Sequence, residues 1–464
     1  MIEVKNSKWI CGFLIATSCM ANAAAPDPTA LEILQKSVSF QTSVGSQQTA
    51  AYAAWLRDTL LAAGFAATDM QIEPQFEGAA ATATFTARWP GRDASKKPLL
   101  LIGHMDVVTA KREDWVRDPF TAIVDGPYLY GRGVKDNKFD ISMMVATLLK
   151  LKRAGFVPSR DIILALTGDE ETTGKGAHRL AERYRHAELV LNGDSGGGKL
   201  DNDTGAPVSY GIQGGEKIYV DFTLSISDPG GHSARPTATN AIYKLSNALV
   251  RLEAHRFAVQ SNELTQGYFR ATAPVTPGPV GEFMRRYVAN PGDAEAVEGL
   301  ARQPEIVGLL RTTCVTTQVA GGHAPNALPQ RATANVNCRI FPGTTIASVQ
   351  QTLQQVLAEP GITITHDASV TKEAPASPLR KDVMDAVAKA VHARFPKLPI
   401  VPTMSPGATD GRDYRALGVP VYGVSGLFIR PADDFAHGLN ERVPLDSIEP
   451  AVAFWESLVR DLSR

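Results

Sequence analysis

The chain contains short runs of consecutive apolar residues that end in glycine followed by histidine or acidic side chains. The clearest run is Leu99–Ile102, which Gly103, His104 and Asp106 follow at once. A strand that is buried on both faces of a sheet has such a continuous apolar pattern. The run therefore predicts a strand of an α/β sheet, with polar groups at the carboxyl end where these sheets place their ligands.

Two more runs predict strands of the same sheet. Residues 161–167 lead into Gly168-Asp169-Glu170-Glu171, and residues 188–191 lead into Asn192-Gly193-Asp194. Segments of helical periodicity precede and separate these strands, with one at 47–64 before the first strand and others at 139–154 and 176–185 between the strands. Strands that alternate with helices predict a largely parallel sheet.

The pattern changes at Gly214-Gly215. Residues 217–227 alternate strictly between apolar and polar, as a half-exposed strand does. The elements predicted in this region follow the order β-α-β-β-α-β of a ferredoxin-like fold. They are a strand at 217–227, a helix at 239–253, a helical insertion to about 311, strands at 313–319 and 331–340, a helix at 346–358 and a strand at 361–366. Beyond about 371 the α/β pattern returns, with a helix at 381–394, a strand at 419–424 and a last helix at 446–462.

The length of 464 residues is too great for one ordinary domain. We predict an α/β domain with a mostly parallel sheet, formed by residues 26–213 and 372–464. A ferredoxin-like α+β domain at 214–371 is inserted into it. Residues 1–24 are predicted to be a signal peptide.

The amino terminus has the features of an export signal. Lys5 and Lys8 precede an apolar segment at 9–19, and Ala21-Asn22-Ala23 has the form of a cleavage site. The apolar segment is shorter than the roughly 20 residues that span a bilayer. We therefore predict export to the periplasm or secretion, with no stable membrane span. A lipoprotein anchored at Cys19 is a less favoured alternative.

The net charge bears on the class of partner, and the cysteine content limits the number of disulfides. The formal net charge is −1 and the pI is about 6.8, so nothing indicates nucleic acid as a partner. After signal cleavage only Cys314 and Cys338 remain. They can form one disulfide in an exported protein, or stay as two buried thiols.

Acidic and histidine side chains gather at the predicted strand ends. They are His104, Asp106, Glu170, Glu171 and Asp194, and Asp136 joins them at a helix start after a loop with Gly131 and Gly133. Carboxylates held close together repel one another unless cations neutralise them. One histidine with several carboxylates suits zinc or a similar divalent ion.

Six motifs resemble those of the dinuclear zinc hydrolases, the family of aminoacylase-1, the glutamate carboxypeptidases, carboxypeptidase S and succinyl-diaminopimelate desuccinylase. The motifs are Gly103–Val108, Gly131–Lys138, Thr167–Glu171, Asn192–Asp194, Thr409–Arg412 and His437–Glu441. In overall pattern the chain looks nearest to carboxypeptidase S. It departs from the family at Phe139 and Asp140, where many relatives have glycine.

The resemblance implies a site with two Zn²⁺ ions, for which Co²⁺ or Mn²⁺ can substitute. His104, Asp136 and Asp194 would hold one ion. Asp136, Glu171 and His437 would hold the other, so that Asp136 bridges the pair. Glu170 would be the general base that activates a metal-bound water, and Asp106 would orient His104.

The resemblance also implies that the α/β domain is the catalytic domain and that the inserted domain at 214–371 serves as a lid or as a dimer face. It further implies roles for residues outside the metal-ligand motifs. His232 would stabilise the oxyanion, either from the lid of the same chain or from a partner subunit. Asn326, Arg339 and Arg412 would bind the substrate, with Arg339 suited to clamp a free carboxylate. Whether the protein forms a homodimer through the inserted domain is left open by the sequence.

Together these features predict an exported zinc hydrolase that cleaves the amide bond next to a free carboxylate in a short peptide or an N-acyl amino acid. The sequence Gly193-Asp194-Ser195-Gly196-Gly197 also occurs in trypsin-like proteases, but those are all-β and no upstream histidine of this chain lies in a matching motif. We interpret it as the ligand Asp194 followed by a flexible glycine-rich loop. The loop at 131–133 lacks the third glycine of a dinucleotide site. A catalytically inactive relative that only binds metal or ligand is the main alternative, and the presence of Glu170 argues against it.

Overall fold

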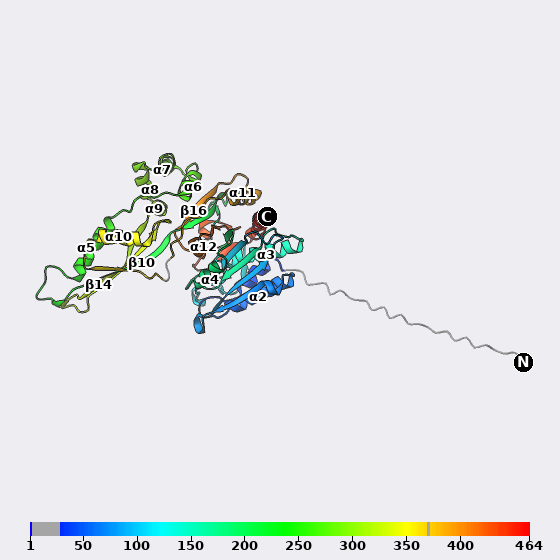
Figure 1. Ribbon diagram of the computed structural model, residues 1–464, viewed down its shortest axis with the longest axis horizontal. Helices are drawn as coiled ribbons and strands as arrows, with labels where there is room; N and C mark the ends of the chain where they lie inside the picture. The colour runs from blue at the N-terminus through cyan, green and yellow to red at the C-terminus, as the bar shows by residue number, and fades with distance from the viewer. Residues whose placement is uncertain (2–27, 369–371) are drawn as a thin grey trace.

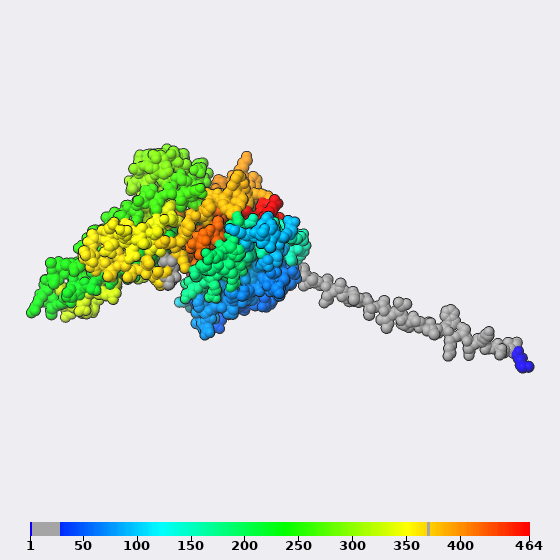
Figure 2. Space-filling view, in the orientation of Figure 1, coloured from blue at the N-terminus to red at the C-terminus, as the bar shows by residue number. Residues whose placement is uncertain are grey.

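The computed structural model describes Met1, residues 28–368 and residues 372–464. The predicted signal peptide at 1–24 therefore lies, apart from Met1, outside the described residues. The chain forms a larger lobe around a ten-stranded sheet and a smaller lobe around a four-stranded sheet (Figures 1 and 2). Within the described ranges, no helix has the length and apolar character that a membrane crossing requires.

The main sheet of the larger lobe is parallel at its centre, where β6, β3, β7 and β17 lie side by side. Its order is β1-β2-β6-β3-β7-β17-β9-β8-β18, and β16 pairs with β9. The strands are β1 (Met70–Gln75), β2 (Thr82–Trp89), β3 (Leu99–His104), β6 (Ile162–Thr167), β7 (Leu189–Asn192), β8 (Gly197–Leu200), β9 (Pro207–Glu216), β16 (Ile400–Ser405), β17 (Val421–Gly423) and β18 (Phe428–Ile429). This α/β architecture confirms the predicted fold class.

Helices cover both faces of this sheet. One face packs against α1 (Ala30–Val38), α2 (Thr49–Ala62), α3 (Lys138–Arg153), α11 (Lys381–Arg394) and α13 (Ile448–Leu462). The other face packs against α4 (Lys175–Arg183) and α12 (Gly411–Ala416). Successive residues of a strand point to opposite faces, and Leu99 and Leu100 accordingly lie in two different cores. Burial on both sides explains why β3 is apolar without interruption.

The smaller lobe, called the lid below, has an antiparallel sheet of order β12-β14-β10-β15. Its elements are β10 (Ile218–Ser227), α5 (Ala241–Ala254), β12 (Thr313–Gly321), β14 (Arg331–Ile340), α10 (Ile346–Leu357) and β15 (Ile362–Thr365). The helices α5 and α10 share one core with the sheet. This order of elements and strands is the predicted ferredoxin-like arrangement.

A helical subdomain interrupts the lid between α5 and β12. It consists of α6 (Glu263–Thr272), α7 (Gly278–Ala289), α8 (Ala294–Ala301) and α9 (Pro304–Leu310), which share a core of their own. Helix α6 packs on β16 of the larger lobe (Figure 1). Beside it, the buried Lys217 Nζ donates hydrogen bonds to the carbonyl oxygens of Gly308 and Arg311. The insertion thus contacts both lobes near Lys217, where the chain first passes from the larger lobe to the lid.

Cys314 and Cys338 form a disulfide that links β12 to β14. The two residues face each other in the antiparallel register of these strands. The sequence is compatible with either one disulfide or two free thiols, and the structure contains the disulfide.

Several elements differ from the sequence prediction. The glycines after Ser195 were expected to form a flexible loop, but Gly197 begins β8. Sequence reasoning also missed α1, β1, β9, β16 and α12. Two small sheets complete the fold, β19-β5-β4 and β11-β13, with β4 (Ile123–Asp125), β5 (Tyr128–Tyr130), β11 (Gly231–His232), β13 (Ala327–Leu328) and β19 (Arg442–Pro444).

Candidate metal centre

The predicted metal-binding side chains meet at the carboxyl ends of three adjacent parallel strands. His104 is the last residue of β3, which lies between β6 and β7. Glu171 follows β6, and Asp194 follows β7. The parallel pairing of these strands therefore brings side chains that are far apart in the sequence to one edge of the sheet.

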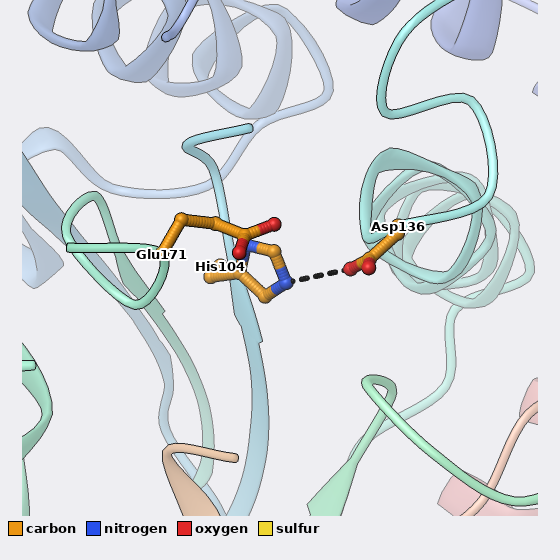
Figure 3. A group of neighbouring side chains, drawn as sticks. All are labelled: His104, Asp136 and Glu171. Carbon is orange, nitrogen blue, oxygen red and sulfur yellow. Dashed lines mark hydrogen bonds and ion pairs between the residues drawn. The ribbon is translucent and has the colours of Figure 1, made fainter. Parts of the chain in front are cut away.

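Asp136 lies between two imidazoles. Its Oδ1 is 3.0 Å from Nε2 of His104, and its Oδ2 is 3.2 Å from Nε2 of His437. It comes from the loop before α3, and its carboxylate points toward the end of β3 (Figure 3). The peptide bond that follows Asp136 is cis. The two oxygens of one carboxylate thus face two different histidines.

Each histidine has a second carboxylate beside it. Nε2 of His104 is 3.3 Å from Asp194 Oδ1. Nε2 of His437 is 2.9 Å from Glu171 Oε1. The result is two groups of three ligand-type side chains that share Asp136, the division that the family resemblance implied.

The donor atoms fit a pair of divalent cations. One ligand atom from each of His104, Asp136 and Glu171 lies within 4.8 Å of the other two. Imidazole nitrogens and carboxylate oxygens are the donors that zinc accepts. The pKa of Asp194 is raised to about 6, chiefly by burial; His104 lowers this pKa, whereas the neighbouring carboxylates of Asp136 and Glu171 raise it. Cations at this site would relieve that repulsion.

Asp106 contacts both His104 and the acidic pair. Its carboxylate lies 3.6 Å from Nδ1 of His104, and its backbone oxygen lies 3.0 Å from the same atom. The carboxylate also accepts hydrogen bonds from the backbone amides of Glu170 and Glu171, at 3.2 and 3.0 Å. Asp106 therefore holds the Glu170–Glu171 turn in place as well as the ring of His104.

Glu170 stands beside the metal-ligand groups. Burial raises the pKa of its carboxyl well above the ordinary value, and the acidic neighbours Asp194 and Asp410 add to this rise while His104 opposes it. A carboxyl group with a raised pKa binds a proton more readily near neutral pH, which suits a general base that must also return the proton.

Glu441 and Arg132 complete the centre, and sequence reasoning assigned no role to either. Glu441 is buried and accepts hydrogen bonds from the backbone amides of Gly133, Lys135 and Asp136. Arg132 Nη1 donates to Glu441 at 2.8 Å. The sequence signal for these two residues was their place inside the motifs that also carry Asp136 and His437.

The predicted residues of the lid lie apart from the metal-ligand groups. His232 is exposed in the short β11-β13 ribbon, and the turn before β13 carries the exposed Asn326. Figure 1 shows this lobe extending away from the main sheet. Arg339 Nη1 donates to the carbonyl oxygen of Pro406 at 2.7 Å, and its guanidinium lies over the ring of Tyr219.

Arg412 lies on α12 of the larger lobe. Its Nε is buried without a hydrogen-bond partner and lies 3.6 Å from Asp413 Oδ2. Ser195, the serine of the trypsin-like motif, donates its hydroxyl hydrogen to Gln213. That contact gives no support to a serine nucleophile.

Residues 100–461 match peptidase family M20/M25/M40, and the chain belongs to this family. The N-fatty-acyl-amino acid synthase/hydrolase of Homo sapiens is 29% identical over 384 residues, which cover 80% of this chain and 75% of the relative. The probable carboxypeptidase S-like 2 of Dictyostelium discoideum is 27% identical over 394 residues, covering 81% and 74%. The crystal structure of an M20 family metallo-carboxypeptidase from Sulfolobus solfataricus superposes with a TM-score of 0.67 at 18% identity, covering 94% of this chain and 99% of that chain.

Family membership confirms the resemblance that the motifs indicated. The protein is an enzyme of a metal-dependent class, a metallopeptidase or amidohydrolase of the carboxypeptidase or aminoacylase type. The relatives include carboxypeptidase S-like proteins, the group that the overall pattern favoured.

Proposed function

We propose that this protein is an exported, zinc-dependent hydrolase that cleaves the amide bond next to a free carboxylate in N-acyl amino acids or short peptides. The observation that carries the proposal is the position of Asp136, whose two carboxylate oxygens face His104 at 3.0 Å and His437 at 3.2 Å. A carboxylate in that position suits a bridge between two cations. Zinc is the cation that the donor set favours, with Co²⁺ or Mn²⁺ as substitutes.

The side chains of the centre have different tasks in this proposal. His104, Asp136 and Asp194 hold the first cation. Asp136, Glu171 and His437 hold the second. When bound, such a pair polarises the amide carbonyl and makes water a stronger nucleophile. Asp106 fixes the orientation of His104 and the position of the Glu170–Glu171 turn.

Glu170 moves the proton. It accepts a proton from the attacking water and gives it to the departing amine, so that the amine leaves in neutral form. His232 stabilises the oxyanion when the lid closes over the site or when a second subunit supplies it. Asn326, Arg339 and Arg412 bind the free carboxylate, for which an arginine fork is well shaped.

Location, domain limits and assembly belong to the same proposal. The features of residues 1–24 support export to the periplasm or secretion. The separate sheets of the two lobes support a division into residues 26–213 and 372–464 on one side and 214–371 on the other. The edge strand β12 exposes Val315 and Val319, with 61% and 68% of each residue accessible. An exposed apolar edge supports a homodimer through the lid, which light scattering on the purified protein would test.

A catalytically inactive binding protein, the alternative raised by the sequence, is not favoured, because the chain belongs to a peptidase family and contains Glu170. Purified protein should be assayed against N-acyl amino acids and dipeptides, with and without a chelator. We expect hydrolysis that the chelator abolishes and Zn²⁺ restores. Turnover that resists metal removal would refute the mechanism, and no turnover with metal bound would favour the binding protein.

A further inference from the structure

Asn137 stands at the N-cap position of α3, directly after Asp136. Asparagine at an N-cap ordinarily accepts a hydrogen bond from a backbone amide in the first turn of the helix. Asn240 does this at the start of α5, where its side chain accepts from the amide of Tyr243 at 3.1 Å. Within the described first turn of α3, Asn137 makes no such bond, although only 2% of the residue is exposed. Its amide group therefore serves something other than the helix.

The side chain of Asn137 continues the hydrogen-bond ladder between β3 and β7. The parallel register of these strands ends at the pair Ile102 and Asn192, and Ile102 O accepts from the amide of Gly193 at 3.0 Å. A parallel ladder of this register would next join the amide of His104 directly to the carbonyl oxygen of Gly193. Instead, Asn137 Oδ1 accepts from the amide of His104 at 3.4 Å, and its Nδ2 donates to the carbonyl oxygen of Gly193 at 2.9 Å. One side-chain amide thus stands where the two strands would otherwise pair.

The start of α3 needs space at both strand ends. A Cβ on Gly103 would lie 2.5 Å from Asn137 Oδ1. A Cβ on Gly193 would lie 2.8 Å from the Cβ of Asp140, in the first turn of α3. Both distances are shorter than real Cβ atoms allow. Glycine at these two positions therefore lets α3 begin directly against the ends of β3 and β7, with the amide of Asn137 between them.

The strand ends that Asn137 joins carry two of the three ligands proposed for the first cation. His104 is the last residue of β3, and Asp194 follows Gly193 directly. Nε2 of His104 lies 3.3 Å from Asp194 Oδ1. An amide with a hydrogen bond on each side spans more than one direct N–H···O bond, whose length is about 2.9 Å. The side chain of Asn137 therefore sets how far apart the two strand ends stand, and with them these two ligands.

Other groups hold the ligands of the second cation. The backbone amide of Glu171 donates to the carboxylate of Asp106 at 3.0 Å. Arg132 Nη2 donates to the carbonyl oxygen of His437 at 3.3 Å. These contacts come from elements other than the start of α3. A change in the side chain of Asn137 should therefore act on one cation site and leave the other as it is.

We propose that Asn137 is a positioning residue that sets the spacing of His104 and Asp194, and so the affinity of the first cation site. The inference rests on the proposed function and adds to it a residue that supports one of the two cations. Asp136, which both cations share, is held by the hydrogen bond of its backbone amide to Glu441 at 3.0 Å. A substitution of the Asn137 side chain leaves that bond in place.

The test titrates metal-free protein with Zn²⁺ in a calorimeter. The wild type should bind two equivalents. Asn137→Ala should weaken one of the two binding steps by about 10- to 100-fold and leave the other unchanged. Asn137→Gln keeps both hydrogen-bonding groups, but its side chain is one methylene longer and so alters the spacing. It should weaken the same step, which keeps the test decisive if the alanine variant does not fold.

Parent variants that lack one site show which binding step is affected. His437→Ala removes a ligand of the second cation only. Adding Asn137→Ala to it should lower the remaining zinc affinity by the factor seen in the otherwise wild-type chain. Asp194→Ala removes a ligand of the first cation only, and adding Asn137→Ala to it should leave the remaining affinity unchanged.

Asn240→Ala is the matched control, because Asn240 is also a buried asparagine at a helix N-cap, with 8% of the residue exposed, but belongs to the lid. It should lower the melting temperature through loss of its cap and leave both zinc affinities unchanged. Unchanged zinc binding in Asn137→Ala, equal losses at both sites, or an equal loss in Asn240→Ala would overturn the inference. A wild type that does not bind a pair of zinc ions would instead refute the proposed function.

Discussion

The backbone amide of Asp136 donates a hydrogen bond of 3.0 Å to the carboxylate of Glu441. The same carboxylate accepts from Arg132, whose Nη2 donates to the carbonyl oxygens of His437 and Gly438 at 3.3 and 3.0 Å. One buried carboxylate thus joins the loop that presents Asp136 to the loop that presents His437. Both loops must hold their positions for the two histidines to face one carboxylate.

Glu441→Gln should therefore weaken metal binding. Oε1 accepts two backbone amides, and Oε2 accepts a third amide and Arg132. In the variant, the side-chain NH₂ group of glutamine would replace one of these oxygens. It would then face two hydrogen-bond donors without being able to accept from either. We expect zinc affinity to fall by about 10- to 100-fold, as when other groups that support metal ligands are lost. Calorimetric titration of metal-free protein with Zn²⁺ measures this directly.

Asp161→Asn is the matched control for that experiment. Asp161 also accepts hydrogen bonds from an arginine, Arg88, and from a backbone amide, that of Gly91. It precedes β6 and so lies at the end of the sheet away from the metal centre. Equal losses of zinc affinity in both variants, or none in Glu441→Gln, would contradict the role assigned to Glu441.

Asp140 should give stability a measurable pH dependence. Burial raises the pKa of its carboxyl from 3.8 to about 7. Because the folded state binds this proton more tightly, the stabilising contribution is complete below pH 3.8 and is lost as the pH rises through 7. Asparagine can keep the contacts with Trp455 and Ser425 without titrating. The stability of Asp140→Asn relative to wild type should therefore increase between pH 4 and 8, by a few kcal/mol.

Chemical denaturation at several pH values provides this comparison. The difference between the two free energies of unfolding isolates Asp140 from the other titrating groups, which both proteins share. A difference that stays constant with pH would show that Asp140 keeps an ordinary pKa in the folded state.

The disulfide should stabilise the lid and leave the larger lobe unaffected. It closes a loop with a sequence separation of 24 residues, and loss of such a link costs about 3 kcal/mol in the chain-entropy account. The five tryptophans lie at positions 9, 55, 89, 115 and 455, outside residues 214–371. In Cys314→Ser/Cys338→Ser, unfolding monitored by circular dichroism should gain an earlier phase, whereas the midpoint from tryptophan fluorescence should not change. A shift of the fluorescence midpoint would mean that the two lobes unfold together.

The sequence predicted those parts of the fold in which burial alone determines the pattern. Leu99–Ile102 was predicted as a strand because a central parallel strand is apolar on both faces. β8 begins with two glycines, and β16 contains Pro402, which sequence rules associate with turns and edges. Their pairing with β9 in the folded protein overrides those local preferences.

Prediction of the candidate centre from the sequence has a similar limit. His104 and Asp136 were found because histidine and aspartate at strand and helix ends are typical of metal ligands. The contacts of Glu441 with three backbone amides leave no signal in residue type, since an amide exists at almost every position. The exposed position of His232 depends on how far the lid stands from the larger lobe, and no local pattern encodes that distance.

The proposed mechanism depends most directly on Glu170, and Glu170→Gln isolates its role because the side chain keeps its size while losing its basicity. Zinc content by elemental analysis and kcat/KM on the best substrate from the screen should be measured on the same preparation. We expect zinc content equal to that of the wild type and a decrease in kcat/KM of about 10²- to 10⁴-fold. Full zinc content with unchanged turnover would contradict the assignment of Glu170 as the general base.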